Sequence, residues 1–393
     1  MRVTEPEFMK SFAFATVPAI QAEWSAGRRL GEILSGRLAE RRALIVTDAG
    51  LVRAGLLAPA LASLEAHGFV VQVFDAVVAD PPESVLLGCV AQAHEHGADL
   101  VIGLGGGSSL DIAKLAAVLV RTPQPLAGMY GIGNVQGARA RLVLIPTTAG
   151  TGSEVTNIAI LTTGETTKMG VVSSQLYADF VLLDAELTLG LPAIHTAATG
   201  IDAMVHAIEA YTSRHKKNPI SDALAREALR LLSGNLLRAC EDGSDRAARE
   251  AMLLGACLAG QAFANAPVAA VHALAYPLGG HYHVPHGLSN ALMLGPVLRF
   301  NAQAAAPLYA ELAGIVAGPG AFGSDEAASE AFVAAMETLM NRSGAPRRLR
   351  DVGVTDNSLA LLASDAMKQS RLLVNNPVEV TEADALALYR EAF

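Results

Sequence analysis

The sequence VIGLGGGSSLDIAKLAAVL (residues 101–119) combines a strand pattern, a glycine-rich turn and a helical pattern in direct succession. The glycines at 105–107 allow a ligand to approach the backbone closely, and Ser108 and Ser109 are placed to cap the helix. Free N–H groups and the positive end of the helix dipole would face one point, which suits a phosphate. A glycine triplet also occurs in plain turns, so the prediction depends on the flanking strand and helix.

Short β-branched runs around this segment alternate with helical patterns over the first half of the chain. The predicted strands are RALIVTDAG (42–50), FVVQVFDAVV (69–78), DLVIGLGGG (99–107), ARLVLIPTT (140–148) and DFVLLD (179–184). The segments between the first three are mainly helical, and such alternation is typical of a parallel sheet with crossover helices. We therefore predict a Rossmann-like α/β fold for this half, with a nucleotide-binding role.

The pattern changes after Leu189 to Ala/Leu-rich stretches with helical spacing, such as residues 221–240, and no further strand run of that quality follows. A boundary near Gly190, just before Pro192, is expected. The sequence thus predicts an α/β domain at 1–189 and an all-helical, metal-binding domain at 190–393.

Composition narrows the functional classes. The chain has 393 residues, of which 51% are hydrophobic, so it can bury a large core, and two domains are the default for this length. Its formal net charge of −9 argues against a nucleic-acid partner, which needs a basic face. Cys89, Cys240 and Cys257 are far apart and form no disulfide framework, which predicts reduced thiols and a cytoplasmic location.

Two segments bear on whether the chain is exported or inserted into a membrane. The first twenty residues carry Glu5, Glu7 and Lys10 and lack the apolar region and cleavage site of a signal peptide. Residues 251–280 contain no charged side chain and are long enough to span a bilayer, yet they include Gln261 and other polar groups. We expect a buried helix there, and no membrane partner.

Asp202 and His206 in TGIDAMVHAIEAY are four residues apart, so on a helix both side chains leave the same face. His272 and His286 are separated by a segment with two prolines and two glycines, which is expected to turn and bring both rings to one ion. One oxygen and three nitrogen ligands suit Fe²⁺ or Zn²⁺ better than Mg²⁺ or Ca²⁺. Ordinary core or surface histidines are the alternative, which the apolar surroundings of His272 make less favourable.

Two further features indicate a nucleotide. Asp48 ends an early strand, where a carboxylate can bind an adenosine ribose and repel a 2′-phosphate, which favours NAD over NADP. The same Asp could simply cap the next helix. Thr147, Thr148, Thr151 and Ser153 follow another strand end and could hold phosphate or ribose, or form an ordinary Ser/Thr turn. The glycine segment matches neither a G-x-G-x-x-G fingerprint nor a P-loop.

Four motifs, GGGSSLDIAK, PTTAGTGSEVT, TGIDAMVHAIEAY and HALAYPLGG with VPHGLSNALML, occur in the same order as in the iron-containing (group III) alcohol dehydrogenases. The chain resembles this family over roughly residues 40 to 300. The resemblance implies a nucleotide-binding α/β domain, a helical domain, and a cleft between them that holds NAD(P) and a metal. It also implies a homodimer.

Matched residue by residue, the resemblance implies that Asp202, His206, His272 and His286 bind the metal, Fe²⁺ or another divalent ion such as Zn²⁺. The family's cofactor-binding residues correspond to Asp48, Gly106, Gly107, Ser108, Thr147, Thr148, Thr151 and Lys168. Taken alone, Lys168 would be an unremarkable surface lysine.

One position departs from the family pattern. Many members have a second histidine four residues after the third metal ligand, near the substrate, and this chain has Tyr276 there. Tyr276 could donate a hydrogen bond or shape the pocket. His281 or His283 could relay a proton in place of the missing histidine.

The resemblance implies hydride transfer between nicotinamide and a small alcohol or carbonyl compound bound at the metal. A hydroxyacid–oxoacid transhydrogenase or another hydroxy-acid oxidoreductase is the nearest alternative. A lyase resembling dehydroquinate synthase and a non-catalytic binder are more distant ones. No cluster of arginines occurs in the recognisable motifs, which favours a neutral alcohol or aldehyde over an acid.

Overall fold

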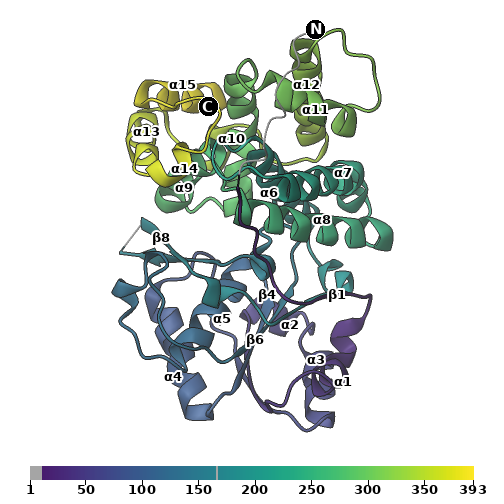
Figure 1. Cartoon of the computed structure of the whole chain (residues 1–393), viewed down its shortest axis with the longest axis vertical. Coiled ribbons are helices and arrows are strands. Elements are labelled where there is room, and N and C mark those ends of the chain that lie inside the picture. The colour runs from purple at the N-terminus through teal and green to yellow at the C-terminus, as the bar shows by residue number, and fades with distance from the viewer. Residues whose placement is uncertain (1–10, 165–166) are drawn as a thin grey trace.

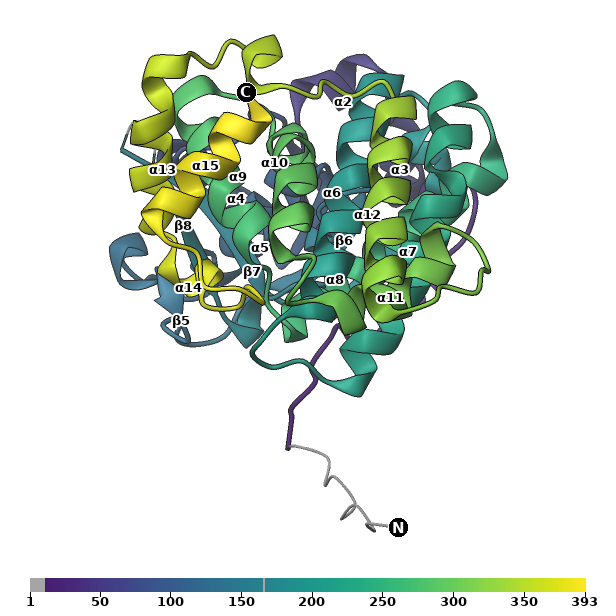
Figure 2. The same ribbon diagram turned by 90° about the horizontal axis from the view of Figure 1, so that it is seen from above.

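The computed structural model of the protein describes residues 11–164 and 167–393. Two halves lie one above the other, an α/β half formed by the first part of the chain and a helical half formed by the second (Figure 1). Viewed from above, the helical half covers the α/β half, with α6, α8 and α10 near the centre (Figure 2). The predicted fold class is therefore confirmed.

The α/β half is built on a six-stranded sheet in the order β1-β9-β6-β4-β2-β3, and all of its pairings are parallel. The strands are β1 (Ile20–Ala22), β2 (Arg42–Val46), β3 (Val70–Phe74), β4 (Leu100–Gly105), β6 (Arg141–Pro146) and β9 (Phe180–Leu183). Parallel strands need crossover connections, which here are mainly helical, and their carboxyl ends share one edge of the sheet. That edge faces the helical half.

Successive side chains of each strand point to opposite faces, so both faces of the sheet need a cover. Leu44 and Val46 pack on the side of α4 (Glu83–His96) and α5 (Gly107–Leu119). Ala43 and Ile45 pack on the side of α1 (Leu30–Ser35) and α3 (Ala58–Ala66). Figure 1 shows these two helix layers on either side of the strands. The buried cluster on the α5 side continues into the helical half, so the two halves share one core.

A second, three-stranded sheet lies at the boundary between the halves. It has the order β5-β8-β7, with β5 (Gly131–Ile132) parallel to β8 (Thr167–Val172), and β7 (Ile158–Thr163) antiparallel to it. β7 contacts α5, and β8 contacts α9 of the helical half. This sheet therefore forms one wall between the halves.

The helical half begins at α6, ten residues after the last strand of the large sheet. Its helices are α6 (Ala193–Thr212), α7 (Pro219–Glu241), α8 (Arg246–Asn265), α9 (Ala270–Tyr282), α10 (His286–Asn301), α11 (Ala306–Val316), α12 (Asp325–Arg342), α13 (Leu359–Met367), α14 (Ser370–Leu373) and α15 (Glu382–Ala392). Among the described residues no strand follows β9. Where one domain ends and the next begins near Gly190 stays a prediction.

The five predicted strands are confirmed, each somewhat shorter than its sequence pattern. Four strands were not predicted, namely β1, β5, β7 and β8. β1 and β5 are only three and two residues long, β7 mixes buried and half-exposed side chains, and β8 is mostly exposed or half-exposed. Such short or mixed runs become strands only because a neighbouring strand supplies the hydrogen bonds.

The uncharged segment 251–280 forms parts of two helices, α8 and α9, rather than the single buried helix that was expected. The chain breaks at residues 266–269, and the two helix axes are bent by 105°. Among the described residues no single helix is long and apolar enough to cross a membrane, although this bent pair passes such a test by length and composition. Residues 1–10, on which the absence of a signal peptide was argued, lie outside the described residues.

One close approach between the two halves involves a pair of glycines. A Cβ atom on Gly260 of α8 would lie 2.8 Å from the Cα and carbonyl oxygen of Gly152, which itself has a φ of +60°. Real Cβ atoms do not come that close to backbone, so α8 can pack on the loop after β6 only through these glycines.

We predict that Gly260→Ala lowers the thermal unfolding temperature, because overpacking costs about 1–3 kcal/mol. The matched control is Gly234→Ala on α7, where a Cβ would meet nothing within 4 Å. That change should stabilise the exposed helix by roughly 0.5–1 kcal/mol. Calorimetry on both variants measures their unfolding temperatures. Equal changes in unfolding temperature at the two positions would contradict the proposed contact.

Candidate active site

Three side chains on one face of α6 start the candidate metal centre. Asp202, His206 and Glu209 are spaced by four and then three residues, so they leave the helix on the same side. Asp202 is 1% exposed, His206 3% and Glu209 4%, in the middle of an otherwise apolar helix. Buried charged and polar groups of this kind need partners, which the next two helices supply.

His272 lies in the first turn of α9, and His286 is the first residue of α10. The chain turns between them at His283, which adopts the left-handed conformation with a φ of 53°, and at Pro285. Pro277 and the glycines at 279–280, which were expected to form this turn, lie within α9 instead. The reversal thus takes three residues, 283–285, and it places both rings beside α6.

The four predicted ligand residues come together at one point: one ligand atom from each lies within 4.8 Å of the others. His286 Nε2 is 3.7 Å and His206 Nε2 3.9 Å from Asp202 Oδ1, and His272 Nε2 is 3.0 Å from His206 Nε2. In a tetrahedral site with bonds of about 2.1 Å, ligand atoms lie roughly 3.4 Å apart. The cluster therefore has the dimensions of a divalent-metal site, although metal binding stays a prediction.

The protonation states of the candidate ligand side chains also suit the binding of a cation. Burial lowers the pKa of His206 to about 3 and that of His286 to about 4, so both imidazoles are neutral at pH 7. Burial raises the pKa of Asp202, but the surrounding imidazoles and a hydrogen bond outweigh it and leave the pKa below its ordinary value. Neutral imidazoles and an ionised carboxylate are the forms that bind metal.

Glu209 was not predicted, yet it positions the ligand set. Its carboxylate accepts hydrogen bonds from the backbone N–H groups of Ala269 (2.9 Å) and Val271 (2.7 Å) and from Nδ1 of His272 (2.6 Å). Donation from Nδ1 leaves the Nε2 lone pair of His272 pointing at the cluster. Its spacing on α6 was the signal that could have revealed it, because it continues the Asp202–His206 face.

Asn290 was not predicted either, and its side chain contacts three of the four candidate ligands. Its Nδ2 atom donates to Asp202 Oδ1 at 2.6 Å and lies 3.2 Å from His272 Nε2 and 3.3 Å from His286 Nε2. Its Oδ1 atom is buried without a hydrogen-bond partner in the part of the chain that the structure describes. Asn290 is four residues after His286, so the i, i+4 rule applied to Asp202 and His206 would have found it as well.

The glycine-rich turn joins β4 to α5 as predicted, but the expected serine caps are absent. α5 begins at Gly107 with Gly106 as its N-cap, and no side chain caps it, so Ser108 and Ser109 lie inside the first turn. The first N–H groups of α5 therefore remain free for a ligand. A Cβ on Gly107 would lie 2.8 Å from Thr151, which explains the need for glycine there.

The threonine-rich loop after β6 lies beside this turn. Thr148 and Thr151 line the cleft, whereas Thr147 does not and instead donates its backbone N–H to Gly105. A buried lysine ties the loop to α5: Lys114 donates to Ser153 Oγ at 2.7 Å, to Thr156 and to a backbone carbonyl. All three of its N–H groups are thus satisfied inside the protein. Neither Lys114 nor Asp111, which accepts from Ser153, had been assigned a role.

Asp48 caps the short helix α2 (Ala49–Arg53), accepting from the N–H groups of Gly50 (2.8 Å) and Leu51 (3.1 Å) through Oδ1. The capping role is therefore real, and Asp48 is not among the residues that line the cleft. It does stand next to the glycine turn, because Leu51 Cδ1 is 3.4 Å from the Cβ position of Gly105. A cofactor ribose beyond the pyrophosphate could reach it.

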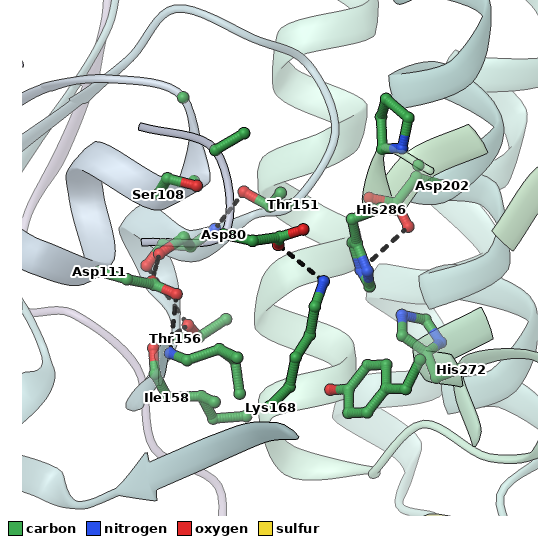
Figure 3. A pocket seen from close by; sticks show the side chains of 18 of the residues that line it. Asp80, Ser108, Asp111, Thr151, Thr156, Ile158, Lys168, Asp202, His272 and His286 are labelled. Atoms are coloured by element: carbon green, nitrogen blue, oxygen red, sulfur yellow. Dashed lines mark hydrogen bonds and ion pairs between the residues drawn. The ribbon is translucent and has the colours of Figure 1, made fainter. Parts of the chain in front are cut away.

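Lys168 on β8 points into the cleft and is no ordinary surface lysine. Its side chain is 6% exposed, and Nζ lies 2.7 Å from Asp80 Oδ1. Figure 3 shows it between Ser108 and Thr151 on one side and the candidate metal ligands on the other. Nζ is also 2.9 Å from the Cβ position of Gly279 on α9, so the side chain crosses from one half to the other.

Tyr276 lines the cleft beside the cluster, with its ring centre 6.1 Å from that of His286. His281 is placed elsewhere: it does not line the cleft, and its Nε2 lies 2.5 Å from Asp365 Oδ2. The structure does not bring His281 to the candidate site, because its ring pairs with a carboxylate of α13, and its role as a proton relay stays a prediction. His283 is exposed at the turn and also lies outside the cleft lining.

One continuous cleft joins the glycine turn, the threonine loop, Lys168 and the four ligand residues. The cavity volume of this cleft is about 380 Å³, and the cleft is open to solvent. Ligand sites in proteins are typically roughly 300–1,000 Å³, so this volume is that of a small-molecule or cofactor site.

Fold and site together combine a Rossmann-like α/β half with a candidate divalent-metal centre. Comparison with known proteins agrees: residues 18–185 match the family model of iron-containing alcohol dehydrogenases, and residues 196–393 match the C-terminal model of the same family. The chain belongs to the iron-containing alcohol dehydrogenase family.

Individual relatives span nearly the whole chain. A long-chain-alcohol dehydrogenase of Geobacillus thermodenitrificans is 43% identical over 91% of both chains. The structure of an alcohol dehydrogenase from Oenococcus oeni superposes with a TM-score of 0.93 at 33% identity, covering 98% of this chain and all of that one. A sulfoacetaldehyde reductase from Bifidobacterium kashiwanohense, solved in complex with NAD⁺, has a TM-score of 0.85 at 28% identity, with 97% and 98% covered.

We predict that Glu209→Gln weakens metal binding by about 10–100-fold, the usual effect of losing a hydrogen-bond partner behind a ligand. The amide would present an N–H group where three donors now converge. Competition with a chelator measures the affinity. Glu241→Gln, at the exposed end of α7, is the matched control and should bind metal as the wild type does. Equal affinities in all three proteins would contradict the positioning role of Glu209.

Proposed function

We propose that the protein is an NAD-dependent, divalent-metal-dependent alcohol dehydrogenase that also reduces the corresponding aldehyde. The observation that carries this proposal is the shared cleft. The phosphate-binding turn of α5 and the four-residue metal cluster open into the same space, with Lys168 between them. A nicotinamide and a substrate held at the ion site could therefore meet within this one cleft.

The proposed position of the cofactor follows from the backbone N–H groups at the start of α5 that no side chain caps. The uncapped N–H groups at Gly107 and Ser108 suit a pyrophosphate, and the hydroxyls of Thr148 and Thr151 face the same space. Lys168 lies farther along the cleft, toward the cluster, where a nicotinamide ribose would reach. Thr147 supports the loop from behind through its bond to the glycine turn.

When bound, the ion supplies Lewis acidity to a substrate oxygen, and the nicotinamide accepts or supplies a hydride. Asp202, His206, His272 and His286 would hold the ion through one carboxylate and three neutral imidazoles. Glu209 holds the Nδ1–H of His272 and so keeps its Nε2 lone pair directed at the ion site. Phe263 stacks on His206 at 4.3 Å and limits the access of water from that side.

The proton released from the alcohol needs a route to solvent. Burial raises the pKa of Tyr276, so its phenol is a hydrogen-bond donor at neutral pH rather than a base. We propose that it orients the substrate oxygen and that water in the open cleft takes up the proton. The histidine that relatives carry at this position is thus replaced by a donor that stays protonated.

The preference for NAD is tested at Asp48. Asp48→Asn removes the charge that would repel a 2′-phosphate but keeps a good helix cap, whereas Asp48→Ala removes both. We expect both variants to lower the ratio of NAD to NADP efficiency by about ten-fold or more, as for a lost charged hydrogen bond. Only Asp48→Ala should also lose about 1 kcal/mol of stability. An unchanged cofactor ratio in both would contradict this role.

Iron is the metal we propose, on the strength of the family, with Zn²⁺ as the alternative that the same donor set accepts. A homodimer in the cytoplasm is part of the same proposal. The free state of Cys89, Cys240 and Cys257 supports a reducing compartment. Sedimentation of the purified protein tests the dimer, and cell fractionation tests the location.

The reaction itself is tested with metal-reconstituted protein, NAD and a series of primary alcohols and diols. We expect NADH to accumulate, with a rate that depends on added metal and NAD, and Asp202→Ala to fall to the background rate while remaining folded. Constant NADH absorbance during turnover would indicate a lyase. Turnover between two substrates without added NAD would indicate a transhydrogenase. Either result would contradict the proposed function.

A further inference from the structure

The charged groups that line the cleft are paired, with one exception. Asp80 pairs with Lys168 at 2.7 Å, and Asp111 lies 3.5 Å from the buried Lys114. Asp202 belongs to the metal cluster. Arg371 lines the same cleft, its side chain is exposed, and it forms no ion pair with any residue that the structure describes. Among the described residues, Arg371 is therefore the one charged group of the cleft lining that has no ionic partner and no place among the candidate metal ligands.

Arg371 reaches the cleft from the opposite half to the phosphate-binding turn. It lies on the short helix α14, and its guanidinium Nη2 is 3.4 Å from the Cβ position of Gly170 on β8. Gly170 is two residues after Lys168, so both occupy the same face of that strand. The guanidinium thus lies against the small sheet, on the wall where Lys168 also stands.

Tyr276 connects this position to the metal cluster. Its ring centre lies 6.1 Å from that of His286, and Tyr276 and Arg371 both line the cleft. Neither the Tyr276 hydroxyl nor the Arg371 guanidinium has a hydrogen-bond partner among residues 11–164 and 167–393, so both donors can bind a ligand in the cleft.

We propose that Arg371 binds an anionic oxyacid group, a carboxylate or sulfonate, at the end of the substrate remote from its reacting carbon. This inference rests on the proposed function. A guanidinium presents two parallel N–H groups to such an anion, and Arg371 can do so without breaking an existing ion pair. The favoured substrates are then short hydroxy or oxo acids rather than the neutral alcohols that the motifs suggested.

A phosphate group of the cofactor is the competing ligand for Arg371, but the position of this arginine disfavours phosphate binding. The phosphate donors are the N–H groups of α5 in the α/β half, whereas Arg371 comes from α14 in the helical half and contacts β8 beyond Lys168. Tyr276, which stands beside His286 of the candidate metal site, lines the same cleft. Arg371 therefore belongs to the substrate end of the cleft.

Two aldehydes with the same four-carbon chain test the proposal, namely succinate semialdehyde, which ends in a carboxylate, and butanal, which ends in a methyl group. In the metal-loaded protein with NADH, kcat/KM should be higher for succinate semialdehyde. Arg371→Gln should lower the ratio of the two kcat/KM values by about ten-fold or more. Arg371→Lys, which keeps the charge but loses the fork of donors, should retain part of the ratio.

Arg342→Gln is the matched control, because Arg342 is an exposed arginine at the end of α12 that does not line the cleft. It changes the net charge equally and should keep the wild-type ratio. The ratio should also fall with rising salt in the wild type and not in Arg371→Gln. A ratio that is the same in wild type and Arg371→Gln overturns the proposal. So does a raised KM for NADH with both aldehydes, which would assign the arginine to the cofactor.

Binding without turnover separates this inference from the proposed reaction. Isothermal titration with 4-hydroxybutyrate, in the absence of NAD, reports the anion site even if neither aldehyde is reduced. Tighter binding to wild type than to Arg371→Gln supports the anion site whatever the reaction. Equal binding to both, together with reduction of butanal, overturns the anion site and leaves the dehydrogenase function standing.

Discussion

The carboxylate of Glu209 is the interaction on which the site depends most. It accepts three N–H donors, two from the start of α9 and one from His272, and so joins α9 to α6 inside an apolar core. The charge also lies at the N-terminus of α9, where the helix dipole favours an anion. One side chain therefore sets the position of α9, the tautomer of His272 and the direction of its ligand lone pair. Asn290 adds a similar constraint on Asp202 from α10.

The site also requires that the two halves of the molecule stay at a fixed separation. Gly152 and Gly260 let α8 contact the loop after β6 directly, and Lys168 reaches from β8 to α9 across the open part of the cleft. The same loop is tied to α5 through the buried Lys114. The two halves are consequently held by direct backbone contact, and the loop that makes this contact is fixed to α5 by buried polar bonds. In the proposed function, the relative position of the halves decides whether cofactor and substrate can meet.

Much of this arrangement could be predicted from the sequence, and the exceptions have physical reasons. The five long strands and the α5 turn follow from local patterns of β-branched residues and glycine. The Asp202–His206 pair follows from helical spacing, and Glu209 and Asn290 obey the same rule but have no metal-ligand signature that draws attention to them. The serine caps of α5 were wrong, because the helix begins at Gly107, two residues earlier than a cap at Ser108 requires. Pro277 was read as a turn residue, yet in this buried segment it lies within a helix.

Other features could not be predicted because they depend on distant contacts. His281 is held by Asp365, and Arg371 reaches the cleft from a four-residue helix far from every motif. The most direct test of the central claim is X-ray absorption spectroscopy of the metal-loaded protein. The account predicts an ion bound by one carboxylate oxygen and three imidazole nitrogens at about 2.0–2.2 Å, with one imidazole lost in His272→Ala. A spectrum dominated by sulfur ligands, or one unchanged in His272→Ala, would contradict it.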